Sequence, residues 1–100
     1  SANTVNNNTA NGNSTVGIGI LSSPGARVYG NVTNGNTQYG IGVDGSGVQV
    51  FSNTSAMANG TFDLFDTSAT CSGNLWGNNV FQTSASGPIA TPTSPSPCIH

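Results

Sequence analysis

Charged side chains are almost absent from this chain. Its 100 residues include one arginine, no lysine, three aspartates, no glutamate and one histidine, giving a net charge of −2. Nucleic-acid binding needs several cations to neutralise phosphates, so no nucleic-acid partner is expected. Surfaces rich in hydroxyl and amide groups with so little charge are more common outside cells, so the composition favours an extracellular, secreted protein.

Long apolar stretches and helical patterns are also missing. No apolar run approaches the length of about 20 residues that a membrane-spanning helix needs, so no membrane span is expected. The Leu- and Ala-rich spacing of helical repeats is absent too. Only 34% of the residues are hydrophobic, which limits the core of a single 100-residue domain.

An internal repeat is the main feature that the chain does contain. The segment 8–20, NTANGNSTVGIGI, returns at 31–43 as NVTNGNTQYGIGV, with seven of thirteen positions identical at an offset of 23. Four apolar residues each stand three positions before an asparagine: Val5, Val28, Val50 and Trp76. Apolar pairs separated by one residue recur as Ile18/Ile20, Ile41/Val43 and Phe62/Leu64. This separation is typical of strands, whose side chains alternate between two faces.

A unit of about 22 residues suits one coil of a parallel β-solenoid, in which coils stack about 4.8 Å apart. The chain carries N-x₈-G-I-x-[IV] in two coils, aligned asparagines, and the ending DLFD…C…N-x-W-x-x-N-x-F. On these motifs it resembles right-handed parallel β-helix repeat proteins of the pectate-lyase-like superfamily, over roughly Thr4 to Phe81. The resemblance implies an all-β, right-handed parallel β-helix of about four coils, ending like the final coils of a secreted member.

Two regions are expected along the chain. Residues 1–82 form the coils, and residues 83–100 form a tail rich in Ser, Thr and Pro. An even number of cysteines in a secreted chain indicates a disulfide, here between Cys71 and Cys98. Such a bond would clip the tail to the last coil. Two unpaired buried thiols are the alternative.

The aligned asparagines predict an internal ladder of amide hydrogen bonds, in which each side chain bonds to the next coil. The ladder residues are Asn8, Asn31, Asn53 and Asn79. The rival interpretation is that these asparagines only form turns on the surface.

Glycan acceptors are a further prediction. Five N-x-[ST] sequons occur, but those of Asn31 and Asn53 fall on the expected ladder. The remaining candidates for N-glycosylation are Asn7, Asn13 and Asn59. The tail segment TPTSPSP has the composition of O-glycosylated stalks, with Thr91, Thr93, Ser94 and Ser96 as acceptors. A plain capping segment is the alternative.

Residues capable of chemistry are few. The ionisable candidates are Asp44, Asp63, Asp66, Arg27 and His100. Asp63 lies between Phe62 and Leu64, which are expected to face inward, so its side chain is expected to point outward. The aspartates are therefore expected to cap turns and solubilise the surface, and calcium at Asp63 and Asp66 is the less favoured alternative. No catalytic residue, metal or cofactor is assigned.

Aromatic side chains on the surface would provide a strip on which sugar rings can stack. Trp76 aligns with Val50 and Val28 and is expected in the core or an end cap, and Tyr29 and Tyr39 are the better exposed candidates.

Three functions remain open. The favoured hypothesis is a non-catalytic, secreted structural subunit that stacks on copies of itself, head to tail, in an extracellular fibre. Alternatively, these are the C-terminal coils of a larger carbohydrate-active β-helix enzyme or adhesin. A small carbohydrate-binding module with a polysaccharide partner is the third hypothesis.

Overall fold

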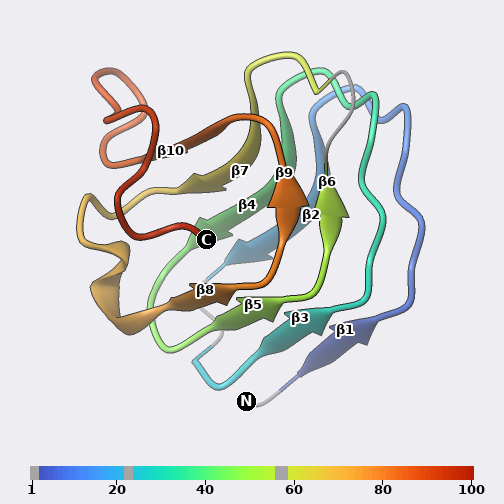
Figure 1. Ribbon diagram of the computed structural model, residues 1–100, viewed down its shortest axis with the longest axis horizontal. Helices are drawn as coiled ribbons and strands as arrows, with labels where there is room; N and C mark the ends of the chain where they lie inside the picture. The colour runs from blue at the N-terminus through green and yellow to red at the C-terminus, as the bar shows by residue number, and fades with distance from the viewer. Residues whose placement is uncertain (1–2, 22–23, 56–58) are drawn as a thin grey trace.

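The chain folds as a parallel β-helix in a computed structural model that describes residues 3–21, 24–55 and 59–100 (Figure 1). The described strands are β1 (Thr4–Asn6), β2 (Val16–Leu21), β3 (Arg27–Tyr29), β4 (Tyr39–Asp44), β5 (Gln49–Phe51), β6 (Thr54–Ser55), β7 (Phe62–Asp66), β8 (Leu75–Gly77), β9 (Val80–Phe81) and β10 (Ser84–Ser86). One 3₁₀ turn, η1 (Cys71–Gly73), precedes β8. Within the described ranges, no helix is long and apolar enough to cross a membrane.

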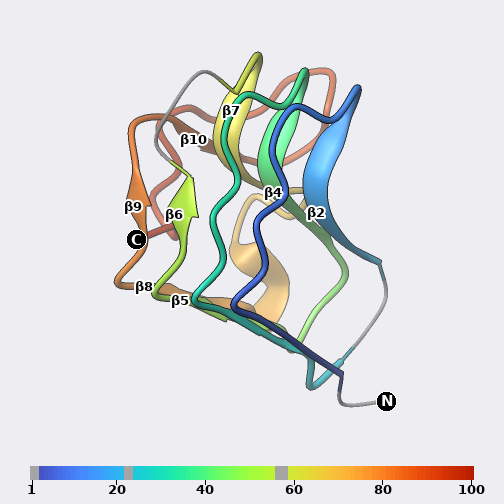
Figure 2. The same ribbon diagram turned by 90° about the vertical axis from the view of Figure 1, so that its right-hand side faces the viewer.

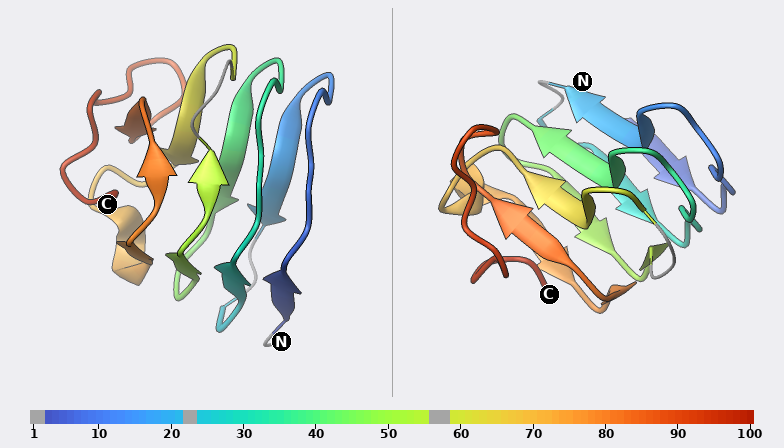
Figure 3. Two further views of the ribbon diagram at one scale, coloured as in Figure 1. Left: turned by 45° about the vertical axis from the view of Figure 1, so that its right-hand side comes forward. Right: turned by 90° about the horizontal axis from the view of Figure 1, so that it is seen from above.

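Two four-stranded parallel sheets and a two-stranded one form the walls of the β-helix. Their strand orders are β1-β3-β5-β8, β10-β7-β4-β2 and β6-β9. Each larger sheet takes one strand from each coil, so its four strands correspond to about three complete turns of the chain. The coils stack along one axis, with the first coil at one end and the C-terminal tail at the other (Figure 3). The all-β, solenoid prediction is thereby confirmed.

The register of the first sheet follows the repeat seen in the sequence. Val5 pairs with Val28, Val28 with Val50, and Val50 with Trp76. In the other large sheet, however, Ile41 pairs with Leu64 and Val43 with Asp66. The sequence alignment of Phe62/Leu64 with Ile41/Val43 is therefore wrong by two residues. The shift pairs Phe62 with Tyr39, and its ring stacks with the outer-face rings of Tyr39 and Phe65, so the expectation that Phe62 faces inward is wrong. Leu64 lies in the core, as expected.

The alternation of side chains breaks at one corner of each coil. The pairing of β2 with β4 skips Gly17 and Gly40, and the pairing of β4 with β7 skips Gly40 and Asp63. As a result Tyr39 and Ile41, two residues apart, lie on opposite faces: Ile41 is 0% exposed in the core, while the Tyr39 ring stacks on Phe65 at 4.7 Å. A Cβ at Gly40 would meet the Ser55 hydroxyl and, at 2.6 Å, the Asp63 carbonyl, so this corner requires glycine.

The core is a narrow apolar column inside the coils. Its fully buried members include Val28, Ile41, Val48, Val50 and Leu64. Burying each such side chain contributes about 1.5 to 3 kcal/mol, which offsets part of the entropy of ordering the chain.

The tail completes the C-terminal end of this column. The expected boundary after residue 82 falls just before β10, which still pairs with β7. Thr93 then forms an antiparallel bridge with Ser86, and Ile99 is buried in the core cluster. Figure 2 shows the tail returning to the strands of the last coil.

Candidate functional site

Four asparagines of the repeat form one continuous line of hydrogen bonds, called the first ladder. It runs from Asn8 through Asn31 and Asn53 to Asn79. Each Oδ1 in the next coil accepts from both the main-chain N–H and the Nδ2 of the previous asparagine, at 2.9 to 3.2 Å. Asn31 and Asn53 are each 1% exposed, which is not the setting of a surface turn.

The second proton of each ladder amide is also used. Nδ2 of Asn31 donates to the Val5 carbonyl at 3.0 Å, and Nδ2 of Asn53 donates to the Val28 carbonyl at 2.9 Å. Every inner amide thus bonds to the coil before it and the coil after it. Each buried N–H or C=O group left without a hydrogen bond would lower the stability by about 1 to 3 kcal/mol. The ladder therefore stabilises the corner only when all of its asparagines are present.

A second ladder runs along another corner and was missed from the sequence. It consists of Asn13, Asn36 and Asn59, with the same double donation to each Oδ1 at 2.9 to 3.1 Å. The signal was present, because these three asparagines are spaced by 23 and 23 residues, the offset of the repeat.

Membership of this second ladder corrects one glycan prediction. The Asn59 Nδ2, the atom that an N-glycan would modify, donates to the Thr33 carbonyl, the Ser55 hydroxyl and the Asp63 carboxylate. A sugar there would break this set, so Asn59 is a poor acceptor. Asn7 and Asn13, the other two candidates, are exposed.

Asp63 faces a buried corner and not the solvent, so its expected outward direction is wrong. The residue is 3% exposed. Its Oδ1 accepts from Asn59 Nδ2 at 2.9 Å, and its Oδ2 accepts from the main-chain N–H groups of Gln82 and Thr83 at 2.8 and 3.0 Å. The strict alternation on which the expectation depended stops at this position, where the pairing skips Gly40 and Asp63.

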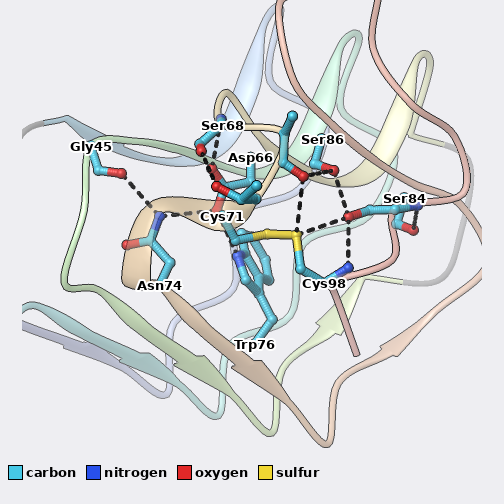
Figure 4. Close-up of a disulfide and its surroundings, with 12 residues drawn as sticks. Gly45, Asp66, Ser68, Cys71, Asn74, Trp76, Ser84, Ser86 and Cys98 are labelled. Atoms are coloured by element: carbon cyan, nitrogen blue, oxygen red, sulfur yellow. Dashed lines mark hydrogen bonds between the residues drawn. A yellow bond between two sulfur atoms is a disulfide. The ribbon is translucent and has the colours of Figure 1, made fainter.

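Asp66 is the second buried carboxylate and lies in the core column. It is 0% exposed and takes the position that Val43 holds in the coil before. Its Oδ1 accepts from the Ser68 N–H at 3.0 Å, and its Oδ2 accepts from Asn74 Nδ2 at 3.0 Å and Trp76 Nε1 at 2.9 Å (Figure 4). Trp76 is 5% exposed, in the core as expected.

The predicted disulfide joins Cys71 to Cys98 across a sequence separation of 27, beside the Asp66 cluster (Figure 4). It fixes the tail against the last coil. Ser96, predicted as an O-glycan acceptor, is instead 8% exposed and donates from Oγ to the Ser86 hydroxyl at 2.8 Å. The other three tail acceptors are exposed: Thr91, Thr93 and Ser94.

Both ladders end at the C-terminal side on acceptors from the same chain. Asn79 Nδ2 donates to the main-chain carbonyl of His100 at 2.8 Å, and Asn59 Nδ2 donates to Asp63 Oδ1 at 2.9 Å. The tail therefore serves as a cap for the first ladder as well as for the apolar column.

Aromatic rings form a row on the outer surface of β4 and β7. Tyr39 and Phe65 stack at 4.7 Å, and Phe62 lies 6.1 Å from Phe65. Tyr39 and Phe65 line a groove of about 170 Å³ over β2, β4 and β7, rimmed by Leu21 and Ile89, which are 72% and 69% exposed. Phe65 itself is only 2% exposed, so Tyr39 is the more accessible ring of the two. Tyr29, the other predicted tyrosine, stacks on Phe51 at 5.0 Å; both tyrosines are half-buried.

The ionisable residues do not come together as a reactive cluster. Asp44 is exposed and accepts from the Thr67 hydroxyl, and Arg27 and His100 are exposed as well. Over residues 3–21, 24–55 and 59–100, no three His, Cys, Asp or Glu side chains lie in a metal-binding arrangement. Asp63 and Asp66 bond to separate sets of donors, which gives no support to a shared calcium site.

These features define a disulfide-capped parallel β-helix whose buried corners are amide ladders. The chain belongs to the NosD family: the family model described as periplasmic copper-binding protein (NosD) matches residues 1–91. This membership agrees with the parallel β-helix part of the resemblance, and the periplasmic description is consistent with an exported protein. Searches of curated proteins and of solved structures gave no match.

Proposed function

We propose that this chain is a non-catalytic structural module of an exported protein, a rigid β-helical segment on which no residue performs chemistry. The observation that carries this proposal is that the buried asparagine side chains bond to the chain itself, in two ladders that run along the axis. Such ladders hold neighbouring coils in one register and make the module stiff.

The two buried carboxylates support the same proposal. Glycoside hydrolysis needs two carboxyl groups about 5 to 9.5 Å apart that flank a sugar bond and remain free to exchange protons with it. Asp63 and Asp66 each accept three hydrogen bonds from their own chain and are 3% and 0% exposed. Both carboxylates are therefore used in hydrogen bonds within the fold.

Assembly with further β-helical units is part of the proposed role. A head-to-tail fibre of this chain alone, as expected from the sequence, would need the tail to leave Asn79 and uncover the last coil. We therefore favour assembly through the first coil. Asn7, Thr91 and Thr93 are exposed and are the proposed glycan acceptors in a glycosylating host. Asn13 and Ser94 are exposed too, but Asn13 Nδ2 donates to Asn36 and Ser94 Oγ donates to the Ser84 carbonyl, so both are poorer acceptors.

The direct test combines activity and size measurements on the purified chain. Incubation with neutral and acidic polysaccharides should release no new reducing ends and no unsaturated products. Sedimentation and negative-stain electron microscopy should show folded particles of uniform width. Turnover that disappears in the D63A or D66A variant would overturn the structural proposal.

Copper, named in the description of the family, does not suit the donors of this chain. Copper prefers imidazole nitrogen and cysteine or methionine sulfur. Both cysteines are joined in the disulfide, His100 is exposed at the chain end, and Met57, the one methionine, lies outside the described residues. Native mass spectrometry with Cu(I) and Cu(II) should therefore show no stoichiometric adduct in the presence of a competing chelator. A retained 1:1 complex would contradict this expectation.

Carbohydrate binding is the second candidate, favoured by the aromatic row beside the groove of β2, β4 and β7. The groove volume of about 170 Å³ is below the roughly 300 Å³ at which small-molecule pockets begin, so only weak binding to an extended polysaccharide is expected. Affinity electrophoresis in polysaccharide gels tests it. Retardation that is lost in Y39A and kept in Y29A would support this function, and equal mobility in all gels would reject it.

A further inference from the structure

The N-terminal face of the β-helix carries unused hydrogen-bond acceptors in a defined arrangement. This face consists of β1, β2 and the ladder residues Asn8 and Asn13. Both asparagines donate to the next coil, through the main-chain N–H and Nδ2. Among the described residues, none donates to the Oδ1 of Asn8 or of Asn13, whereas every later ladder Oδ1 accepts two hydrogen bonds.

The same face covers the end of the apolar column less completely than the inner coils cover its middle. Ile18 is 8% exposed, whereas its register partner Ile41 is 0% exposed. Val5 is half-buried, whereas its partner Val28 is fully buried. The strands β1 and β2 are the terminal strands of their sheets, so no further strand of the described residues pairs with their outer edges (Figure 3). Such an edge is a template for another strand.

The polarity of the ladders decides which surface fits this face. An incoming surface must supply donors at both corners, because both Oδ1 atoms are acceptors. Among the described residues, neither ladder offers a free amide donor at the C-terminal end of a second copy: Asn79 Nδ2 already bonds to His100 and to the Val50 carbonyl, and Asn59 Nδ2 bonds to Asp63. Two N-terminal faces meeting each other would place acceptors against acceptors.

We propose that the N-terminal face binds the C-terminal edge of another parallel β-coil, one that presents asparagine amides at both corners. The pair of asparagines would be five residues apart, as Asn8 and Asn13 are, and so are Asn31 and Asn36. A valine three positions before the first of them would offer its carbonyl to the Asn8 Nδ2, as the Val5 carbonyl does to Asn31. The partner motif is therefore V-x-x-N-x₄-N in a β-coil. This inference rests on the proposed structural role.

Docking of such a coil would repeat, at the first coil, the contacts seen at the second. Each corner would gain two N–H···O bonds, from a main-chain N–H and from Nδ2, as between Asn8 and Asn31. Asn8 and Asn13, now exposed, would become as buried as Asn31 and Asn36, which are each 1% exposed. The first coil would then change from a fraying end to an inner layer of the stack.

The test adds one coil to the full chain. A copy of residues 24–46 fused before Ser1 places the copies of Asn31 and Asn36 one repeat ahead of Asn8 and Asn13. A matched control carries the same fused coil with both copied asparagines replaced by alanine. We expect main-chain hydrogen exchange at Ile18 and Ile20 to slow at least tenfold in the first protein, and less than threefold in the control.

Three results would overturn the inference. The first is equal protection in the two fused proteins. The second is a fused coil that stays unfolded while Trp76, at the far end, reports a folded host by its fluorescence. The third is a concentration-dependent dimer of the unfused chain that protects Ile18, which would assign the face to a second copy. Polysaccharide cleavage would overturn the proposed function without affecting these readouts, so the two failures are distinguishable.

Discussion

At the scale of single residues, asparagine replaces the apolar core where the coil must turn. Its amide offers two donors and an acceptor on a short side chain, so it bonds to the coils on both sides at once. Asn53 illustrates this: its Nδ2 donates to Val28, Phe51 and Asn79, and its Oδ1 accepts twice from Asn31. The buried ladder amides are thus satisfied, whereas the buried Thr33 hydroxyl near Gly40 has no hydrogen-bond partner among the described residues.

Replacing an inner ladder asparagine should therefore cost far more than replacing the terminal one. N53A removes the acceptor of the Asn31 main-chain N–H and Nδ2 and the side-chain donor to the Val28 carbonyl, so we expect a loss of about 2 to 4 kcal/mol in the free energy of unfolding. The matched control N8A removes one 3.2 Å side-chain bond at an exposed position and should cost less than about 1 kcal/mol. Urea unfolding followed by Trp76 fluorescence measures both; similar losses would contradict the ladder's role.

The buried carboxylate of Asp66 gives a second residue-scale prediction. D66A removes the acceptor of Ser68, Asn74 and Trp76 at a position that is 0% exposed, so we expect a loss of about 3 kcal/mol or more. The exposed Asp44 is the control, and D44A should change stability by less than about 0.5 kcal/mol. Thermal unfolding monitored by circular dichroism compares the two. Equal midpoints would show that the Asp66 bonds contribute nothing.

At the scale of elements, glycine allows a strand to turn its corner against the neighbouring coil. Gly40 lies where the pairing of β4 skips a residue, and a Cβ there would meet the Asp63 carbonyl at 2.6 Å and the Thr33 hydroxyl at 2.8 Å. At Gly19, in the middle of β2, the nearest atom to such a Cβ is 4.0 Å away. The two glycines look alike in the sequence and differ in their surroundings.

The G40A and G19A variants test this difference. We expect G40A to lower the free energy of unfolding by about 2 to 3 kcal/mol, because backbone and side chains of the neighbouring coil must move. G19A should stay within about 1 kcal/mol of the parent chain, since alanine fits there. Chemical denaturation of both proteins provides the comparison, and a G40A protein as stable as G19A would argue against the close contact.

At the scale of the whole molecule, a stack of coils has two ends, and this chain closes one of them. The disulfide holds the tail so that Ile99 covers the apolar column and the His100 carbonyl caps Asn79. The first coil has no comparable cover among the described residues. The disulfide and the tail thus stabilise one end of the axis, and the proposed docking face lies at the other.

Removing the disulfide should loosen the capped end. For a double C71S/C98S variant, loss of the cross-link, which spans 27 residues, should cost about 3 to 4 kcal/mol in the free energy of unfolding. The Asn79 main-chain N–H should also exchange faster, since the tail is released. As a control, H100A keeps the capping main-chain carbonyl and should leave both quantities unchanged. Unaltered Asn79 exchange in the double variant would show that the tail stays in place without the disulfide.

Much of the candidate site could be predicted from the sequence, because the same residue types recur at the same positions of each repeat. The valines before each asparagine predicted the pairing of β1, β3 and β5, and the cysteine count predicted the disulfide. Asp63 and Asn59 were misjudged for different reasons. Asp63 lies where the coil departs from two-residue alternation, and there a side chain's direction depends on the neighbouring coil. Asn59 belongs to the second ladder, whose 23-residue spacing is present in the sequence and was missed.

The sequence by itself determined the class of fold, the length of the coil and the position of the first ladder, because these follow from local spacing that recurs every 22 to 26 residues. Only the tertiary structure decided that Asp66 takes a place in the core column, that the second ladder ends on Asp63, and that the tail closes one end while the other presents open acceptors. These outcomes depend on contacts between neighbouring coils. The register of the strands and the direction of the hydrogen bonds determine those contacts, and the sequence of one coil alone does not.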